Sequence, residues 1–252
     1  MINQKINKLL EYRAPSLEET SSFIWQEIGN RLISKLEIIK LQPKIILDIG
    51  CQDFSFSIKL AKIFPEAKIY AADFFMQKDN KLSLDKTDCN NIETINISDL
   101  KTVMEYDSID LIFSNCLIPY IDIELFFKNT YKYLAANSLI LFSGYGPDTL
   151  ENNLSYCNKQ LQSNFIDMHT TGDILMKLKY LSPILETQHI KNIYKSSNKI
   201  LSDISGISGD VCSDKELLYK NIDGLYQLNI ELVLGHAWVS SNKPKIIEVN
   251  NY

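Results

Sequence analysis

Short apolar segments alternate with amphipathic helical segments over the first 150 residues of the chain. The first apolar segment, residues 44–49, reads Lys-Ile-Ile-Leu-Asp-Ile, which is short, rich in β-branched residues and apolar on both faces. A central strand of a parallel sheet has this pattern. Four more segments repeat it: residues 68–72, 93–97, 108–114 and 139–143. Because alternating strands and helices require crossover connections, the sequence predicts an α/β fold with a mostly parallel sheet.

The segments between these strands have helical spacing. Apolar residues recur every three or four positions in residues 25–40, 55–64 and 123–134, which predicts amphipathic helices. We therefore expect an N-terminal helical segment over residues 1–43, followed by the core of the sheet over residues 44–150.

The pattern changes after residue 148. The later segments are residues 149–162 and 172–179, which have helical spacing, and residues 184–190 and 228–239, which resemble strands. We expect an antiparallel strand pair with a helical insertion at about residues 196–226 between its strands. No linker rich in Pro, Gly or Ser interrupts the chain. Residues 151–252 are therefore predicted to complete the same domain.

Composition excludes several classes of function. The chain of 252 residues is 45% hydrophobic and 23% charged, with a net charge of −5. This charge offers no broad basic surface for nucleic acid. The five cysteines show no Cys-x-x-Cys spacing and no apolar leader opens the chain, so we expect a reduced, cytoplasmic protein without a metal site. A membrane span is not expected, because no apolar window of about eighteen residues is present.

Polar residues follow the ends of the predicted strands, where open parallel sheets bind their ligands. Asp48 and Gly50 end the first strand, and Gln52 lies in the following loop, where its side chain either points away or hydrogen-bonds a ligand. Asp73 follows the second strand, at the position of an acid that binds ribose hydroxyls, with a helix N-cap as the alternative. Asp99 follows the third strand and is a further candidate at the same edge of the sheet.

The fourth strand ends in three further candidates. Ser114, Asn115 and Tyr120 follow it, and we expect them to form the floor of a reaction site. The alternative for Ser114 and Asn115 is a structural role, because small polar residues often satisfy backbone groups at a strand end.

Four ordered motifs in the second half carry a resemblance to a known family. They are residues 141–150 (LFSGYGPDTL), residues 165–175 (FIDMHTTGDIL), residues 201–206 (LSDISG) preceded by Tyr194, and residues 235–238 (GHAW). In this order they resemble the malonyl-[acyl-carrier protein] O-methyltransferases of biotin synthesis, over about residues 10 to 240. The resemblance implies a Rossmann-like fold with seven strands and a helical cap. It also implies S-adenosyl-L-methionine (SAM) as cofactor and methylation of the free carboxylate of malonyl-acyl carrier protein or malonyl-CoA.

The resemblance also implies roles for individual residues. The cofactor-binding candidates are Asp48, Gly50, Gln52, Asp73, Asp99, Ser114 and Asn115. The catalytic candidates around the thioester and carboxylate are His169, His236 and Tyr120. The substrate-binding candidates are Arg13, Gly144 and Trp238. Each histidine has a buried structural role as its alternative, and Trp238 has a place in the core as its alternative.

One departure from the family pattern bears on the cofactor. The loop after the first strand usually has glycine at every second position, but Gln52 and Phe54 replace two of the three glycines here. A glycine passes beneath a ligand without a Cβ in the way, so Phe54 has either left the pocket or fills part of it. The alternative to an enzyme is therefore a protein that keeps the fold as a binding or assembly module.

A basic surface for an acidic carrier protein is a further candidate. Five lysines gather in the second half of the chain: Lys177, Lys179, Lys191, Lys195 and Lys199. Such a surface would be electrostatically complementary to the carrier, and ordinary solvated surface is the alternative.

Overall fold

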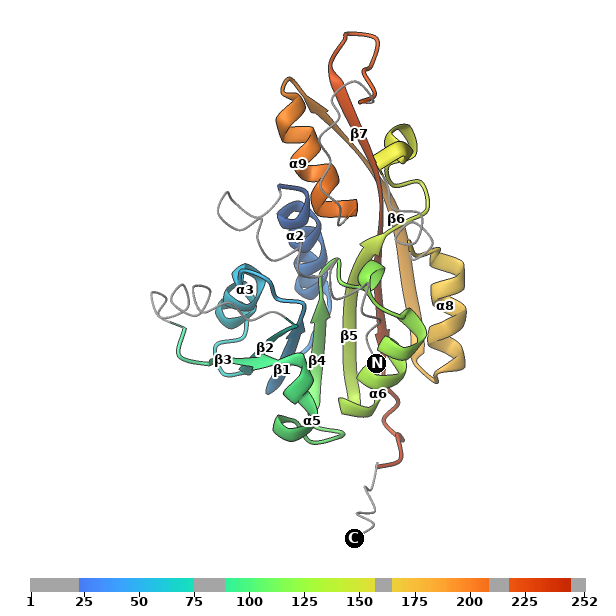
Figure 1. The fold of residues 1–252 in the computed structure, drawn as a ribbon. Coiled ribbons are helices and arrows are strands. Elements are labelled where there is room, and N and C mark those ends of the chain that lie inside the picture. Colours follow the sequence, from blue (N-terminus) through green and yellow to red (C-terminus); the bar gives the residue numbers. More distant parts are fainter. Residues whose placement is uncertain (1–22, 75–88, 157–164, 209–217, 246–252) are drawn as a thin grey trace.

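A computed structural model shows one seven-stranded sheet covered by helices on both faces (Figure 1). The structure describes residues 23–74, 89–156, 165–208 and 218–245. The strands are β1 (Ile45–Ile49), β2 (Lys68–Asp73), β3 (Ile92–Asn96), β4 (Ile109–Ser114), β5 (Leu134–Tyr145), β6 (Leu181–Tyr194) and β7 (Tyr226–Trp238). The helices are α2 (Phe23–Ile38), α3 (Ser55–Ile63), α5 (Leu100–Val103), α6 (Ile123–Tyr133), α8 (Met168–Lys177) and α9 (Ser197–Ser208), with short 3-10 turns η2 (Ile97–Asp99), η3 (Ile118–Tyr120) and η4 (Glu151–Tyr156).

The strand order is β3-β2-β1-β4-β5-β7-β6. Neighbouring strands from β3 to β5 are parallel, and β7 is antiparallel to both β5 and β6. The predicted α/β fold with a mostly parallel sheet of seven strands is confirmed. The strand order reverses at β1, which pairs with β2 on one side and β4 on the other. Open sheets bind ligands at such a switch point.

Aromatic contacts show which helices cover which face. On one face, Phe56 of α3 packs edge-on against Trp25 of α2 and lies beside Phe113 of β4. On the other face, Phe127 of α6 packs against Phe142 of β5. These side chains are almost fully buried. Aromatic packing therefore helps to hold helices against each face of the sheet.

The C-terminal half differs from the sequence-based prediction in its boundaries. β5, β6 and β7 are all longer than predicted, because they pair with one another over long antiparallel registers. In Figure 1, β6 and β7 extend together beyond the parallel strands, with α9 beside them. The predicted insertion at about residues 196–226 contains helix α9, which ends at Ser208; residues 218–225 form no helix, and the residues between lie outside the described part of the chain. Gly224, with φ 73°, lies in a turn there. The spacing of apolar residues does not indicate such a turn, because it depends on the backbone conformation of one glycine.

The predicted helix over residues 149–162 is also only partly correct. Residues 151–156 form the 3-10 turn η4, and residues 157–162 lie outside the described part of the chain. Helix α8 begins earlier than predicted, at Met168, because Asp167 caps it by accepting a hydrogen bond from the Thr170 amide at 2.8 Å. This bond also holds the pKa of Asp167 below its usual value.

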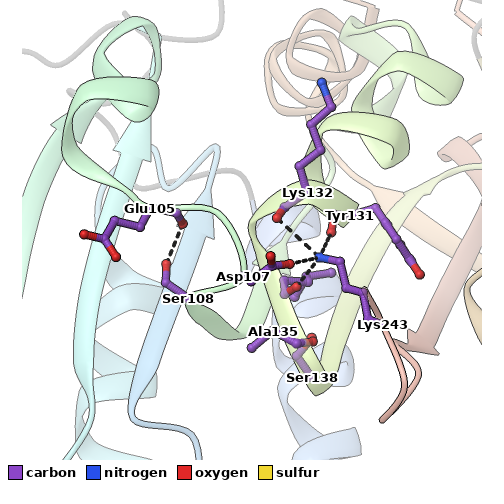
Figure 2. A network of polar contacts seen from close by, with 9 residues as sticks. Glu105, Asp107, Ser108, Tyr131, Lys132, Ala135, Ser138 and Lys243 are labelled. Carbon is purple, nitrogen blue, oxygen red and sulfur yellow. Dashed lines mark hydrogen bonds and ion pairs between the residues drawn. The ribbon is translucent and has the colours of Figure 1, made fainter. Parts of the chain in front are cut away.

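A buried lysine lies at the amino-terminal ends of β4 and β5 (Figure 2). Lys243 has a side chain only 2% exposed, and its Nζ lies 2.6 Å from Asp107 Oδ1. The same ammonium donates to the carbonyls of Tyr131 and Leu134, each at 2.5 Å, and more weakly to that of Lys132. These carbonyls lie at the C-terminal end of α6, where a positive charge is favoured by unsatisfied carbonyls and by the helix dipole.

We predict that Lys243→Met lowers the free energy of unfolding by about 3–5 kcal/mol, because it leaves the Asp107 charge buried without its partner. Urea unfolding measures this loss, and Lys245→Met, at an exposed position two residues on, is the matched control. Asp107→Asn combined with Lys243→Met should cost less than the sum of the single changes. Equal unfolding midpoints for the two lysine variants would contradict the role assigned to this network.

Candidate functional site

The carboxyl ends of four adjacent strands open onto one cavity of about 920 Å³. Ile49 from β1, Phe74 after β2, Ile97 after β3 and Leu117 after β4 all line it. The volume lies in the upper part of the range of roughly 300–1,000 Å³ that is typical of small-molecule sites. The cavity therefore occupies the place where this topology predicts a ligand.

The loop after β1 keeps a glycine-type backbone although two of its glycines are replaced. Gly50, Gln52 and Phe54 have φ angles of 81°, 48° and 62°. A Cβ at Gly50 would lie 3.2 Å from the Cβ of Leu117. For other residues the left-handed conformation costs about 1–2 kcal/mol each. The path of the loop is thus the one that glycines would take.

Phe54 does not occupy the cavity. Its side chain is 1% exposed and packs in a small cluster with Cys51 and Ala71, and it is absent from the described cavity wall. Burial raises the pKa of the Cys51 thiol in the same cluster well above its usual value. The Phe54 ring therefore packs against Cys51 and Ala71 and is not part of the described cavity wall.

Asp73 holds this loop against the end of β2. Its Oδ2 accepts a hydrogen bond from the Gln52 amide at 3.0 Å, and the Gly50 amide donates to the Ala72 carbonyl at 2.8 Å. Asp73 itself is not part of the described cavity wall, which the next residue, Phe74, reaches. The residue predicted to bind ribose thus lies at the switch point, where it accepts a hydrogen bond from the Gln52 main chain.

Asp48 and Asp99 lie outside the described wall of the cavity. The Asp48 carboxylate is buried and accepts from Ser57 Oγ at 2.6 Å, which fastens α3 to β1. Asp99 is exposed, and the wall is formed instead by Ile97 and Ser98 just before it. The third strand end does reach the site, but through residues that the prediction passed over.

Ser114 and Asn115 are buried beneath the cavity. Asn115 Nδ2 donates to the Trp25 carbonyl at 3.0 Å, and Asn115 Oδ1 accepts from Ser143 Oγ at 2.7 Å. These bonds join α2 and β5 to the end of β4, which is the structural role left open by the sequence. Ser114 Oγ finds no hydrogen-bond partner among the described residues.

Tyr120 connects the site to the insertion. Its side chain is 2% exposed, and its hydroxyl donates to the carbonyls of Gly206 at 2.9 Å and Ile207 at 3.1 Å. Both carbonyls belong to the last turn of α9, whose acceptors lack partners within the helix. Tyr120 therefore caps α9, and the next residue, Ile121, lines the cavity.

Gly144 pairs with β7, and the turn after it is hydrogen-bonded to β7. A Cβ at Gly144 would lie 2.8 Å from Ile166 Cδ1, so the glycine allows Ile166 to reach the cavity wall. Thr149 Oγ1 donates to the Glu231 carbonyl at 2.9 Å, and the Glu231 amide lies 3.1 Å from the same hydroxyl. The motif at residues 141–150 therefore helps to hold β5 and β7 together.

The remaining predicted residues are not brought together at the cavity. His169 is exposed in the first turn of α8. His236 lies near the C-terminal end of β7, opposite Leu141 of β5, and burial first, and then the charge of Lys35, lower the pKa of its imidazole. Trp238 is paired with Leu139, toward the opposite end of β5 from Tyr145. Arg13 lies outside the described residues.

Sequence reasoning missed two contributors to the site. Gln26 Nε2 donates to Ser55 Oγ at 2.9 Å, which joins α2 to α3 directly after the loop. Helix α8 supplies Thr170, Thr171 and Ile174 to the cavity wall. Positions 167, 170, 171 and 174 fall on one helix face, a signal that was present in the sequence but pointed to no particular partner.

Neither a metal-binding cluster nor a membrane-spanning helix is present among the described residues. No group of three or more His, Cys, Asp or Glu side chains there is arranged to hold a metal ion. None of the described helices has the length and apolar character needed to span a membrane.

Comparison with known proteins supports the motif resemblance. No family model matches the chain. A malonyl-[acyl-carrier protein] O-methyltransferase of Legionella pneumophila is 25% identical over 264 residues, which cover 96% of this chain and 93% of the relative. One of the same name from a Methylovorus species is 24% identical and covers 90% of this chain and 86% of its own. The resemblance predicted from the motifs is confirmed.

Solved structures share the fold at low identity. The YcgJ protein of Bacillus subtilis has a TM-score of 0.63 at 10% identity, covering 84% of this chain and 98% of its own. The geranyl diphosphate C-methyltransferase of Streptomyces coelicolor, solved with S-adenosyl-L-homocysteine, has a TM-score of 0.56 at 10% identity, covering 85% and 76%. Together with the strand order, these confirm the predicted Rossmann-like methyltransferase fold.

We predict that Tyr120→Phe weakens the attachment of α9. Loss of the hydroxyl leaves two carbonyls without their partner and should lower the free energy of unfolding by about 1–3 kcal/mol. Hydrogen exchange should quicken in α9 while the protection of β1 and β4 changes little. Tyr219→Phe, at a 41% exposed tyrosine, is the control. Unchanged exchange in α9 would show that the capping bonds do not hold it.

Proposed function

We propose that this protein is a SAM-dependent methyltransferase that methylates the free carboxylate of a malonyl group carried as a thioester by acyl carrier protein. The observation that carries the proposal is the cavity at the four strand ends, bordered by a loop that keeps its glycine-type path. The curated relatives named malonyl-[acyl-carrier protein] O-methyltransferase, which match nearly the whole chain, supply the reaction and the substrate.

The residues present fit SAM. Ile97 and Ser98 would lie against the adenine, Asp73 would accept hydrogen bonds from the ribose hydroxyls, and the loop of Gly50 to Phe54 would pass beneath the amino acid portion. The Phe54 ring lies outside the cavity wall, which supports an open cofactor site over the alternative of a binding module. When bound, the cofactor supplies a methyl group on a positively charged sulfur.

The acceptor chemistry explains the lining of the cavity. A carboxyl group is ionised near neutral pH, so the nucleophilic oxygen needs no general base. What the protein must do is hold the oxygen in line with the methyl carbon and exclude water, and alignment of this kind is worth roughly 7–11 kcal/mol of the barrier. The apolar walls formed by Leu117, Ile121 and Ile166 serve that purpose.

Acyl carrier protein is proposed over malonyl-CoA on the names of the relatives. The five lysines suggested from the sequence do not form one patch on a single element. Lys177 lies on α8 in an ion pair with Glu124, Lys191 lies on β6 and Lys199 on α9. We further propose a cytoplasmic location, supported by the described cysteines Cys51, Cys89 and Cys116, which form no disulfide.

Calorimetric titration with SAM and S-adenosyl-L-homocysteine, followed by methyl transfer to malonyl-acyl carrier protein, tests the proposal. We expect micromolar cofactor binding and a methyl ester on the malonyl group. A higher kcat/KM for the carrier protein than for malonyl-CoA would support the choice of carrier. A folded protein that binds neither cofactor and transfers no methyl group would overturn the proposal in favour of a binding module.

We predict that Asp73→Ala weakens SAM binding at least tenfold, because two hydrogen bonds from ribose to a charged acceptor are lost and the loop is released from β2. Asp223→Ala is the control, because Asp223 is exposed in the turn before β7 and is none of the cofactor-binding candidates. Titration calorimetry gives both affinities, and circular dichroism confirms the fold. Equal affinities for the two variants would rule out the ribose assignment.

A further inference from the structure

Ile166 is held at the end of β5 by anchors on both sides of it. Its amide donates to the Tyr145 carbonyl at 2.8 Å, and the ring of Phe165 packs edge-on against the ring of Tyr145. The next residue, Asp167, accepts a hydrogen bond from the Thr170 amide at 2.8 Å and so caps α8. The backbone of Ile166 is therefore fixed between β5 and α8, and its buried side chain forms part of the cavity wall.

Gly144 sets how closely the Ile166 side chain lies against β5. A Cβ at Gly144 would be 2.8 Å from Ile166 Cδ1 and 3.2 Å from Ile166 Cγ1, whereas carbon atoms in contact prefer about 3.5–4.0 Å. Gly144 does not have a positive φ angle, so alanine at this position changes the space and not the backbone. Because the Ile166 backbone is anchored, alanine at position 144 would displace the Ile166 side chain within the cavity wall.

The strand order places Ile166 on the acceptor side of the cavity. The loop of Gly50 to Phe54 follows β1, and β4 lies between β1 and β5 (Figure 1). Neighbouring strands are about 4.8 Å apart, so the end of β5 lies roughly 10 Å from the end of β1. With the cofactor held at the ends of β1, β2 and β3, the space for a methyl acceptor lies toward β5, where Leu117, Ile121 and Ile166 line the cavity.

Ionisation of the acceptor does not by itself select a malonyl group. The free carboxyl of any dicarboxylic acyl group is ionised near neutral pH, so a succinyl group offers an oxygen of the same charge. Selection therefore depends on space. In the proposed reaction both ends of the acyl group are fixed, since its oxygen lies in line with the methyl group and its thioester leads to the carrier. An added methylene must then bulge sideways into the cavity wall.

We propose that Ile166 restricts the acceptor end of the cavity to the short malonyl group and excludes longer dicarboxylic acyl groups, with Gly144 as its positioning residue. In an apolar pocket, one methylene changes the discrimination between two substrates by about 10–200-fold. A wall anchored on both β5 and α8 resists the displacement that a longer acyl group requires. The inference deepens the proposed function, on which it rests for the identity of the acyl group.

The first test compares two acyl groups that differ by one methylene. Protein saturated with S-adenosyl-L-homocysteine is titrated with malonyl-pantetheine and with succinyl-pantetheine by calorimetry. We expect the wild type to bind the malonyl compound at least tenfold more tightly, Ile166→Ala to reduce this preference to threefold or less, and Ile166→Val to reduce it by a smaller factor. Ile200→Ala is the matched control, because it removes the same atoms from a fully buried side chain of α9 outside the described cavity wall. It should keep the wild-type preference.

Gly144→Ala tests the positioning role. It should weaken malonyl-pantetheine binding at least fivefold while the affinity for S-adenosyl-L-homocysteine stays within twofold. Adding Ile166→Val removes Cδ1, the Ile166 atom that lies closest to a Cβ at position 144, so the double variant should bind malonyl-pantetheine within twofold of the wild type. A role of Gly144 in folding alone predicts no such recovery. Thermal unfolding shows which variants remain folded.

The inference is overturned if the wild type binds the two thioesters equally or not at all, or if folded Ile166→Ala and Ile166→Val variants keep the wild-type preference. Unchanged binding by Gly144→Ala would remove its positioning role. Methyl transfer by the wild type is measured separately. Preferential binding of the malonyl compound without transfer would sink the proposed function and leave the selection by Ile166 standing, whereas transfer to both compounds with equal kcat/KM would do the reverse.

Discussion

The central position of β1 is the constraint on which the site depends. β1 pairs with β2 and with β4 in parallel, so the chain that leaves its carboxyl end must turn sharply between two neighbours that also end there. A Cβ at Gly50 would crowd Leu117 at 3.2 Å, and the Gln52 amide donates a hydrogen bond to Asp73. The same crowding that forces this turn opens the space beyond it, because the connections from β1 and β4 leave toward opposite faces of the sheet.

This constraint explains how the loop tolerates Gln52 and Phe54 where glycine is usual. The path of the chain is set by pairing at the strand ends, and each non-glycine residue in a left-handed conformation costs about 1–2 kcal/mol. Burial of a phenylalanine side chain contributes about 1.5–3 kcal/mol in the other direction. Phe54, packed on Cys51 and Ala71, thus offsets its own backbone strain. Phenylalanine in place of glycine at position 54 therefore changes the packing on the side of the loop that faces Cys51 and Ala71, and leaves the backbone path of the loop in place.

The strands and helices of the parallel half were predictable from sequence because each is a local pattern of apolar residues, and Asp73 could be placed because it directly follows one of them. The site was less predictable, since its remaining parts come from long-range packing. The motifs that carry the family resemblance contain His236 and Trp238, yet β7 runs antiparallel to β5 and takes both residues away from the strand ends. Similarly, Thr149 was part of a strong motif because it clasps β7. A sequence motif indicates which residues matter. The topology is needed to tell whether such a residue stabilises the fold or lies at the site.

Among the described residues, Tyr120 links helix α9 of the insertion to the turn after β4. Tyr120 caps the last turn of α9, and Asp203 of that helix accepts a hydrogen bond from Tyr194 of β6 at 2.6 Å. α9 is therefore held from two sides, by the edge strand β6 and by the turn after β4. Because Ile121 and Asp122 follow Tyr120 in the cavity wall, a shift of α9 that kept its bond to Tyr120 would move the residues at the N-terminus of α6. The position of α9 and the shape of the cavity wall at the N-terminus of α6 are thus coupled through Tyr120.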